Sequence, residues 1–387
     1  MAVSIDFAEI VIIAISGRAL AQSAAKSGVP VRVLDAFADA DTRAAAETAC
    51  VGAAGAIALD TARLIGVLEQ LPATSRGRAI VTGSGFERKP QSLRRLARFG
   101  RLCANDADVV AALKQPELAA ELLRAIGWEV PPTQRRAPAD PRGWLQKEIG
   151  GAGGVHVRRA GRPSPRGRTY YQRELPGQSM SVTFLADAER AYVLGFNRQH
   201  VRAVGTAPWC YAGASTCSVQ PLLAAKMQER LDRLVRVAGL RGLNGLDFLL
   251  DDDTVSVLEI NPRPTATFEL YDQDFPEGLV HWHIRSFASA PLADFTGRLR
   301  GRRPAYRAYA IVYAERRLRV PDEVAFPDWC RDLPAAGSLI GPGVPVLSVY
   351  SSGESVALAQ QELRLREQEV RSLVARWMVE SRDACVA

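Results

Sequence analysis

The sequence predicts a mixed α/β (α+β) chain in which a parallel sheet comes first and antiparallel strands follow. Residues 9–15 and 31–34 are apolar runs on either side of a helix-forming segment, the pattern of a parallel β-α-β unit. Residues 243–271 alternate apolar and polar side chains around an Asp-Asp-Asp-Thr turn, the pattern of an antiparallel hairpin. Residues 308–313 and 346–350 predict two further strands between turns rich in proline and glycine. Asn105-Asp106 predicts the cap of a helix that runs through Leu123, and Gly127 ends it.

The composition is that of a large globular chain. Its 387 residues suffice for two or three domains, and 47% hydrophobic with 24% charged residues permits a large core. The longest apolar run, residues 10–15, is too short to span a bilayer, and Asp6 and Glu9 stand where a signal peptide carries positive charge. The six cysteines form no C-x-x-C pair. We therefore expect a cytoplasmic protein without a membrane partner.

The net charge of +7 raises the question of a nucleic-acid partner. Arginines are spread along the whole chain and are not clustered with stacking aromatic residues, so we predict no nucleic-acid partner. The densest basic run, residues 158–168, is rich in proline and glycine. Its sequence leaves open a solvated loop and a site for phosphate or a polyanionic substrate.

The predicted hairpin carries two carboxylates that face each other. If residues 252–254 form the turn, Asp247 lies opposite Glu259 and Gly245 lies opposite Asn261, and the polar set shares one face. Neighbouring carboxylates repel, so this face needs a cation, and all-oxygen ligands suit Mg²⁺ bridging substrate phosphates. Arg263, two residues on, could reach the same phosphates. The alternative is a solvated hairpin face.

A second pattern joins a lysine to a glycine-rich loop. Residues 144–147 and 155–158 predict short strands, and Gly150-Gly151-Ala152-Gly153-Gly154 lies between them. Such a loop lets backbone N–H groups approach phosphate oxygens. Lys147 is one of only five lysines, and its place before the loop indicates a point charge on phosphate. The alternative is a flexible hairpin loop.

These motifs, taken in their order, resemble the ATP-grasp superfamily over roughly residues 9–350. The resemblance implies that Lys147 and Lys114 meet the nucleotide phosphates and that the glycine loop is a mobile lid. Arg263 and Lys147 then act on the transferred phosphate. The implied nucleotide-binding residues are Lys114, Lys147, Gly150, Gly151, Gly153, Gly154, Gln172, Arg173, Glu174 and Leu175. The implied metal ligands are Asp247, Glu259 and Asn261.

Two positions depart from the family pattern. Leu113 precedes Lys114 where family members often have an acid, and Arg173 lies in the segment 171–175 that resembles the adenine hinge. For Lys114 the alternative is an exposed helix lysine.

The amino-terminal segment is similar to a subgroup of predicted ATP-dependent carboligases. The pattern S-G-R-A-L-A-x-S-A at 16–24, the segment 82–87 and the segment 211–214 carry this likeness. The subgroup resembles ligases that join glutamate to tyramine or tyrosine in methanofuran and methylofuran synthesis. Ser16, Gly17 and Arg18 open a helix and suit a carboxylate, the alternative being an N-cap with a surface arginine. The other implied substrate residues are Ser84, Glu87 and Gly213, with a solvated loop acid as the alternative for Glu87.

The resemblance implies five parts and a two-step reaction. The parts are an α/β domain at 1–100, a helical connection at 101–127, a lid at 128–190, a metal-binding subdomain at 191–300, and a β-rich region with a closing helix at 301–387. ATP with Mg²⁺, which Mn²⁺ is able to replace, activates an acid as an acyl phosphate, and an amine displaces phosphate. The alternatives are a bicarbonate-activating carboxylase and a non-catalytic ATP-binding protein. The partners implied are a small acid and a small amine, and a homodimer is left open.

Overall fold

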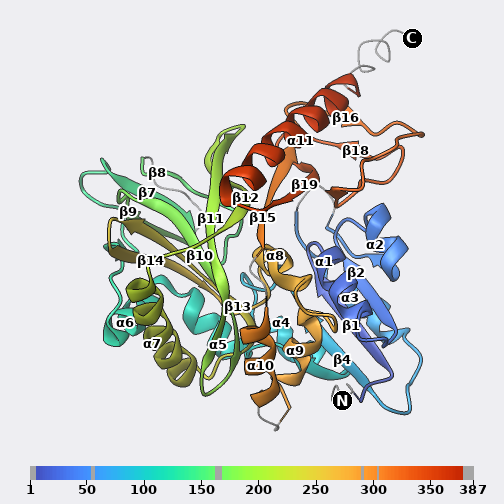
Figure 1. The fold of residues 1–387 in the computed structure, drawn as a ribbon, viewed down its shortest axis with the longest axis horizontal. Helices are drawn as coiled ribbons and strands as arrows, with labels where there is room; N and C mark the ends of the chain where they lie inside the picture. The colour runs from blue at the N-terminus through green and yellow to red at the C-terminus, as the bar shows by residue number, and fades with distance from the viewer. Residues whose placement is uncertain (1–5, 54–56, 162–167, 289–291, 303–304, 378–387) are drawn as a thin grey trace.

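The computed structural model describes residues 6–53, 57–161, 168–288, 292–302 and 305–377 (Figure 1). Of the basic run at 158–168, residues 162–167 lie outside this described part. Among the described helices, none is both long and apolar enough to cross a lipid bilayer.

The amino-terminal part is a parallel sheet with helices around it, as the β-α-β pattern predicts. Its strands follow the order β3-β2-β1-β4-β5. The strands are β1 (Glu9–Ala14), β2 (Val31–Asp35), β3 (Glu47–Cys50), β4 (Arg78–Thr82) and β5 (Arg101–Cys103). The helices are α1 (Arg18–Ala25), α2 (Ala40–Ala45), α3 (Thr61–Glu69) and α4 (Ser92–Leu96). Strand order reverses between β1 and β4, so the loops after these two strands border one crevice.

Two helices, rather than one predicted helix over 105–123, connect this sheet to the rest. They are α5 (Ala107–Lys114) and α6 (Pro116–Ile126). The break falls at Pro116 because proline has no N–H for an intrahelical bond, yet it suits the first turn of a new helix. Asp106 caps α5 as predicted, and Gly127 ends α6 with a positive φ of 96°.

A small four-stranded sheet follows, in the order β6-β9-β7-β8. Its strands are β6 (Thr133–Gln134), β7 (Trp144–Glu148), β8 (Arg158–Arg159) and β9 (Thr169–Arg173). The strand predicted before the glycine loop is confirmed as β7. The strand predicted over 155–158 is wrong for its first three residues, because the chain is still turning there and β8 begins at Arg158.

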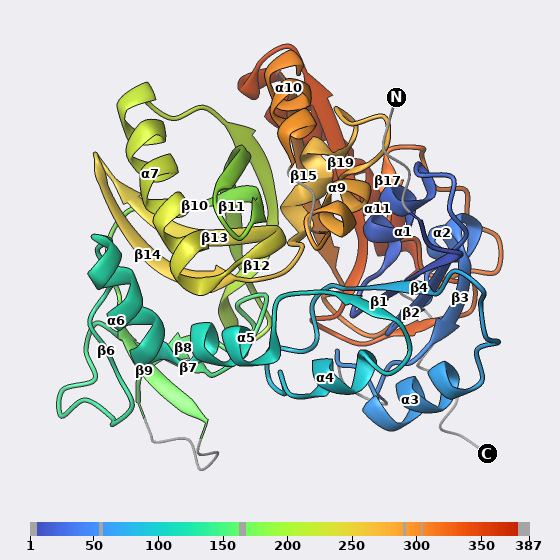
Figure 2. The same cartoon turned by 90° about the horizontal axis from the view of Figure 1, so that it is seen from below.

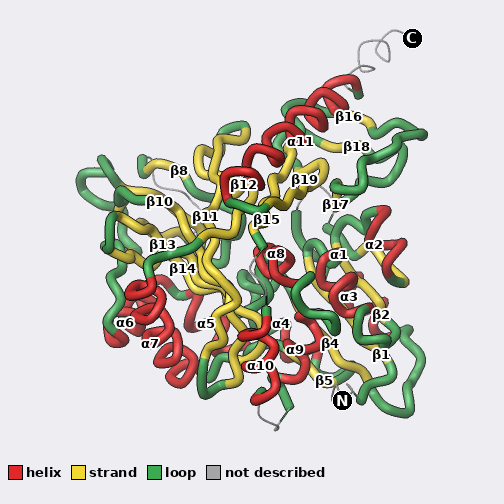
Figure 3. The backbone as a smooth tube through the Cα atoms, in the orientation of Figure 1, coloured by secondary structure: helices red, strands yellow, loops and turns green. Residues whose placement is uncertain are grey.

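A large antiparallel sheet forms the middle of the molecule (Figure 3). Its order is β14-β13-β10-β11-β12-β15-β19-β17. The strands are β10 (Gln178–Asp187), β11 (Ala191–Val204), β12 (Ala207–Cys217), β13 (Arg241–Asp251), β14 (Thr254–Asn261), β15 (Tyr306–Tyr313), β17 (Cys330–Arg331) and β19 (Pro345–Gly353). A separate pair is β16 (Leu318–Arg319) with β18 (Leu339–Ile340). The remaining helices are α7 (Pro221–Ala238), a 3₁₀ turn (Ala266–Phe268), α8 (Glu269–Asp272), α9 (Leu279–Arg285), α10 (Ala293–Gly301) and α11 (Val356–Arg376).

The carboxyl-terminal strands continue this central sheet. β15 pairs with β12, and β19 pairs with β15, so the region predicted as a β-rich addition shares a sheet with the predicted metal-binding subdomain. β10, which the predicted lid range includes, also belongs to the central sheet. The five domain boundaries themselves stay a prediction.

Apolar burial fixes the helices against the two larger sheets (Figures 1 and 2). Leu123 of α6 and Leu231 of α7 pack with Phe184 and Phe248 of the central sheet. Burying each phenylalanine contributes about 1.5–3 kcal/mol relative to leaving it exposed. The predicted closing helix is α11, which packs on the carboxyl-terminal strands and carries i,i+4 ion pairs such as Glu362 with Arg366.

Gly213, a predicted substrate residue, has a structural reason to be glycine. Its φ is +130°, and a Cβ here would overlap the backbone of Tyr309 on the neighbouring strand β15. We therefore expect Gly213→Ala to lower the free energy of unfolding by about 2–4 kcal/mol. Gly205→Ala is the matched control, because Gly205 also has a positive φ but its Cβ would meet open space, so about 1 kcal/mol is expected. Urea denaturation measures both, and equal losses would contradict this explanation.

Candidate functional site

One large cavity collects almost all of the predicted site residues. Its volume is about 1140 Å³, and it is lined by the small sheet, the β13–β14 hairpin, the loops after β1 and β4, and strands β15 and β19. Of the predicted residues, Gly17 and Gly213 do not line it. Segments that are far apart in the sequence therefore meet around one space.

The hairpin pairs its two carboxylates as predicted, but through a different turn. Asp247 lies opposite Glu259 and Gly245 opposite Asn261. Asp251 pairs with Thr254, so the turn holds two residues instead of three, and the register shifts by one between Asp247 and Phe248. The resulting bulge at 258 compensates for the shorter turn. Leu258, predicted on the apolar face, instead lines the cavity.

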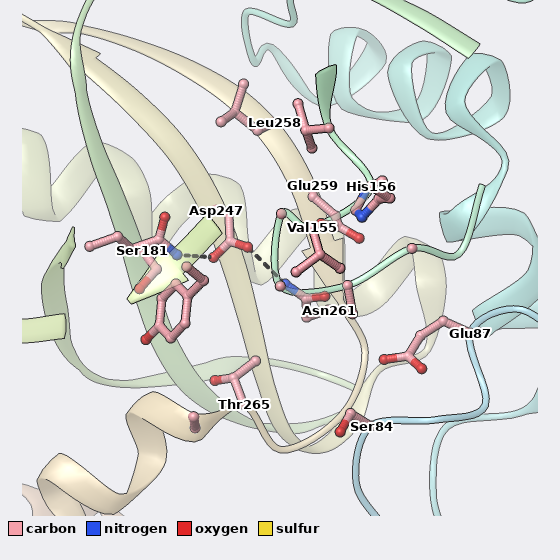
Figure 4. Close-up of a pocket in the computed structure, with 18 of the residues that line it drawn as sticks. Ser84, Glu87, Val155, His156, Ser181, Asp247, Leu258, Glu259, Asn261 and Thr265 are labelled. Atoms are coloured by element: carbon pink, nitrogen blue, oxygen red, sulfur yellow. Dashed lines mark hydrogen bonds between the residues drawn. The ribbon is translucent and has the colours of Figure 1, made fainter. Parts of the chain in front are cut away.

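Amide side chains hold the Asp247 carboxylate of this polar face (Figure 4). Gln199 Nε2 donates to Asp247 Oδ1 at 2.9 Å, and Asn261 Nδ2 donates to Asp247 Oδ2 at 3.0 Å. Burial, with the neighbouring charge of Glu259, raises the pKa of Asp247 to about 6. Burial also acts to raise the pKa of Glu259, but the Lys114 ammonium more than offsets it, so this pKa lies below its usual value.

Lys114 is not the exposed helix lysine that the sequence left open. Its side chain is 4% exposed, and Nζ forms an ion pair with Glu259. Nζ also donates to Ile260 O at 2.8 Å and to Asn261 Oδ1 at 2.9 Å. All three ammonium hydrogens therefore have acceptors on β14.

The donor set of this face fits Mg²⁺. In the described residues, no three or more of His, Cys, Asp and Glu gather as a metal site, so a cation here would rely on two carboxylates, the Asn261 oxygen, water and ligand phosphate. The Lys114 ammonium already lies among these oxygens, which shows that the place accommodates positive charge. Asp247, Glu259 and Asn261 would hold the metal.

Lys147 lies on β7 across the cavity from the hairpin. Its Nζ donates to Gln172 Oε1 at 2.5 Å. Burial lowers the pKa of Lys147, although the charges of Glu259 and Asp247 oppose this shift. Both lysines therefore lie close enough to the hairpin carboxylates to interact with them.

The glycine loop closes one side of the cavity. Gly150, Gly153 and Gly154 have φ near +70°, which favours glycine. Tyr211 N donates to Gly153 O at 2.9 Å, and a Cβ at Gly154 would overlap the carbonyl of Trp209, so the loop lies against β12. His156, which the sequence analysis did not select, packs on Gly151 from the same loop and lines the cavity.

Arg263 is fixed by Glu87 from the amino-terminal sheet. Arg263 Nε forms an ion pair with Glu87, and Gly85 N donates to the other oxygen of Glu87 at 2.8 Å. Glu87 is 5% exposed. Burial acts to raise its pKa, but Arg263 and Lys114 lower it to about 2, so Glu87 stays charged. It is thus a buried partner rather than the solvated loop acid that was the alternative.

Comparisons with known proteins agree with this arrangement. A family model described as an ATP-grasp domain matches residues 117–267. The biotin carboxylase domain of Hydrogenobacter thermophilus 2-oxoglutarate carboxylase, solved with MgADP and bicarbonate, superimposes with a TM-score of 0.73 at 14% identity. That superposition covers 93% of this chain and 89% of the other. The chain has the ATP-grasp fold. The fold predicted from the motif order is confirmed.

Other relatives match the chain over different lengths. N5-carboxyaminoimidazole ribonucleotide synthetase from Thermus thermophilus superimposes with a TM-score of 0.63 at 15% identity, over 96% of this chain and 100% of the other. The carbamoyl phosphate synthase large chain of Deinococcus deserti is 34% identical over 93 residues, which is 23% of this chain. That match spans only 9% of the relative's length. An uncharacterized protein of Methanocaldococcus jannaschii is 22% identical over 46% of this chain and 41% of its own.

The segment that resembles the ATP-grasp hinge, residues 171–175, begins within β9 and continues past its end, and its residues 172–175 line the cavity. Arg173 N donates to Pro132 O at 2.8 Å, and Glu174 N donates to Gly143 O at 2.9 Å. These two N–H groups therefore cannot also donate to a ligand. The Arg173 guanidinium lies over the Trp144 ring, so this side chain does not take the place of an apolar hinge residue. Recognition of adenine by this segment stays a prediction.

The donors at the start of α1 are already used by carboxylates of the chain. Arg18, only 2% exposed, bonds Glu269 at 2.5 and 2.8 Å and Asp332 at 2.8 Å. Gly17 N donates to Asp35 Oδ2 at 3.1 Å, and Ser16 Oγ lies 3.5 Å from Asp332. Arg18 is thus not the surface arginine of the alternative interpretation. Binding of a substrate acid by these three residues stays a prediction, and it would compete with internal carboxylates.

The wall of the cavity near Arg18 is rich in acids and tyrosines that the sequence motifs did not indicate. Glu269, Asp332, Asp39 and Tyr350 line it. Tyr350 Oη donates to Glu269 at 2.5 Å, and its ring stacks on Tyr309 with centroids 5.1 Å apart. Glu269 comes from α8, Asp39 from the loop before α2, Asp332 from the segment after β17 and Tyr350 from β19. Glu269, Asp332 and Tyr350 belong to no local pattern, so spacing along the sequence carries no signal for them.

The environment of Asp39 predicts that the free energy of unfolding depends on pH in an unusual way. Burial, followed by the charges of Asp332, Asp35 and Asp41, raises its pKa to about 8. Between about pH 4 and pH 8 the folded protein keeps a proton that the unfolded chain has released. The free energy of unfolding therefore falls as pH rises through this window, by at most about 1.4 kcal/mol per pH unit from this group.

Asp39→Asn should remove this contribution. We expect its stability relative to wild type to rise between about pH 4 and pH 8 in urea denaturation at several pH values. Asp251→Asn, at the exposed end of β13, is the control and should give a constant difference. A constant difference for Asp39→Asn over this range would contradict the raised pKa.

Proposed function

We propose that this chain is an ATP-dependent carboxylate–amine ligase that forms an amide through an acyl phosphate. The observation that carries the proposal is the cavity itself. It joins the Asp247–Glu259 face and Lys147 to an acid-rich, tyrosine-lined wall in one continuous space. The ATP-grasp fold supports a nucleotide at the first region, and the second leaves room for the other substrates.

In the first step, a substrate carboxylate oxygen attacks the γ-phosphorus of ATP, the bond to the β–γ bridging oxygen breaks, and ADP leaves. Lys147 places its ammonium beside the phosphates, and Arg263 is oriented by its ion pair with Glu87. Asp247, Glu259 and Asn261 would hold Mg²⁺, and the bound metal would neutralise phosphate charge. The glycine loop covers the reacting groups and excludes water, which would hydrolyse the acyl phosphate.

In the second step, an amine nitrogen attacks the acyl carbon, phosphate leaves, and the nitrogen loses a proton. The acid-rich wall supports an amine as the acceptor. There Arg18 is bonded to both Glu269 and Asp332, which leaves one negative charge in excess, while Asp39 stays protonated in the folded protein below about pH 8. This excess favours binding of a cationic amine, which loses a proton to solvent before its nitrogen attacks.

The finer part of the proposal is the pair of substrates. The pattern at residues 16–24, which resembles the carboligase subgroup, supports glutamate as the acid and tyrosine or tyramine as the amine, as in methylofuran-type carrier synthesis. We further propose a cytoplasmic location and a homodimer. The biotin carboxylase domain of Hydrogenobacter thermophilus 2-oxoglutarate carboxylase is a dimer in its crystal structure, which supports the homodimer.

Release of ADP and phosphate tests the reaction. The assay supplies MgATP with L-glutamate, L-tyrosine, tyramine and bicarbonate, alone and in pairs, and identifies products by mass spectrometry. We expect ADP release that needs both an acid and an amine, together with a new amide. Bicarbonate-stimulated ADP release without an amide would favour the carboxylase, to which the full-length likeness to biotin carboxylase domains points. Bound but uncleaved ATP under all pairs would favour a binding protein.

Asp247→Asn and Glu259→Gln test the metal ligands. Each removes one negative charge from the hairpin face, and we expect at least about a 100-fold loss of ADP formation because phosphate charge is less well neutralised. Circular dichroism should show an unchanged fold. Asp253→Asn, an exposed residue in the same hairpin turn, is the matched control and should keep wild-type turnover. Wild-type turnover in either ligand variant would remove the metal assignment.

A further inference from the structure

The ammonium of Lys114 lies where the hairpin would hold a cation. It is the last residue of α5, and its three acceptors are Glu259, the carbonyl of Ile260 and Asn261 Oδ1. Two of these three residues, Glu259 and Asn261, are the proposed metal ligands. A metal ion and this ammonium therefore compete for the same oxygens.

The orientation of Asn261 depends on this arrangement. Its Nδ2 donates to Asp247 at 3.0 Å while its Oδ1 accepts from Lys114 at 2.9 Å. The amide thus already presents its oxygen to a cation and its nitrogen to the neighbouring carboxylate. A metal could replace the ammonium without rotation of this side chain.

The charges around the hairpin decide when such a replacement is favourable. Asp247, Glu259 and Glu87 carry three carboxylates, and Lys114, Lys147 and Arg263 carry three cationic groups, so the set has no net charge when all are ionised. A divalent cation alone would add two charges to a site that is already balanced. Nucleotide phosphates bring the negative charge toward which Lys114 can turn, because its side chain lines the same cavity.

We propose that Lys114 is an internal counter-ion that keeps the metal position closed, so that a divalent cation binds together with the nucleotide and not before it. This proposal rests on the metal site of the proposed function. It gives Lys114 two successive partners, the hairpin oxygens in the free protein and the phosphates in the loaded protein. The exchange protects the paired carboxylates from repulsion in both states.

Binding of Mn²⁺ to the nucleotide-free protein, followed by electron paramagnetic resonance, tests the proposal. Wild type should bind Mn²⁺ weakly alone and at least about tenfold more tightly with ADP present. Lys114→Met removes the ammonium and should bind Mn²⁺ without nucleotide at least about tenfold more tightly than wild type does. Lys147→Met is the matched control. It removes an equally long cationic side chain whose charge also reaches the hairpin carboxylates but whose Nζ bonds Gln172 and no hairpin oxygen, so its Mn²⁺ affinity without nucleotide should rise clearly less than that of Lys114→Met.

Two outcomes would overturn the proposal. One is equal Mn²⁺ affinity of wild type with and without ADP, and the other is no tighter binding in Lys114→Met than in Lys147→Met. Lys114→Gln, which keeps a donor without the charge, serves if circular dichroism shows that Lys114→Met does not fold. The readout needs no turnover. A failure to find any acid–amine pair that releases ADP would therefore leave the Mn²⁺ result standing, and a working ligase would not rescue a failed Mn²⁺ result.

Discussion

The rest of the site depends on the repulsion between two carboxylates placed side by side on an antiparallel hairpin. Strand pairing brings Asp247 and Glu259 opposite each other, and burial makes their mutual repulsion stronger than it would be in water. The surrounding groups respond to that charge. Gln199 and Asn261 donate to Asp247, Lys114 pairs with Glu259, and Lys147 approaches from β7. Each of these residues comes from a different element, so the hairpin acts as the point on which the elements converge.

A second ion pair ties the amino-terminal sheet to this convergence. Glu87, after β4, forms an ion pair with Arg263. The glycine loop packs on the same segment, so closely that a Cβ at Gly150 would lie 2.5 Å from the carbonyl oxygen of Glu87. Glu87 therefore contacts both, the loop through its backbone and Arg263 through its buried carboxylate. Glu87 remains ionised because Arg263 and Lys114 outweigh its desolvation. Under the proposed exchange, Lys114 pairs with the hairpin oxygens in the free protein and with a nucleotide phosphate in the loaded protein.

The wall near Arg18 shows how tertiary contacts change the meaning of a local motif. An arginine at a helix start after a strand suits an anionic ligand when its donors are available. In this chain Glu269 and Asp332, from distant segments, already accept those hydrogen bonds, and further acids surround them. The charge excess of the wall is then negative, and the ligand it favours changes from an acid to an amine. Local pattern and assembled charge point to different substrates at this position.

The sequence by itself determined the parallel amino-terminal unit, the lysine before the glycine loop and the pairing of Asp247 with Glu259, because these follow from the periods of strands and from spacing within a few residues. The local pattern misplaced the hairpin turn and the start of β8, because pairing with neighbouring strands decides where a bulge or a strand begins. It also predicted α5 and α6 as one helix, although Pro116 separates them. The partners of Lys114, Glu87 and Arg18 were decided only by the tertiary structure. Their partners Glu259, Arg263 and Asp332 lie 145, 176 and 314 residues away, and no spacing along the chain records which charges burial will bring together.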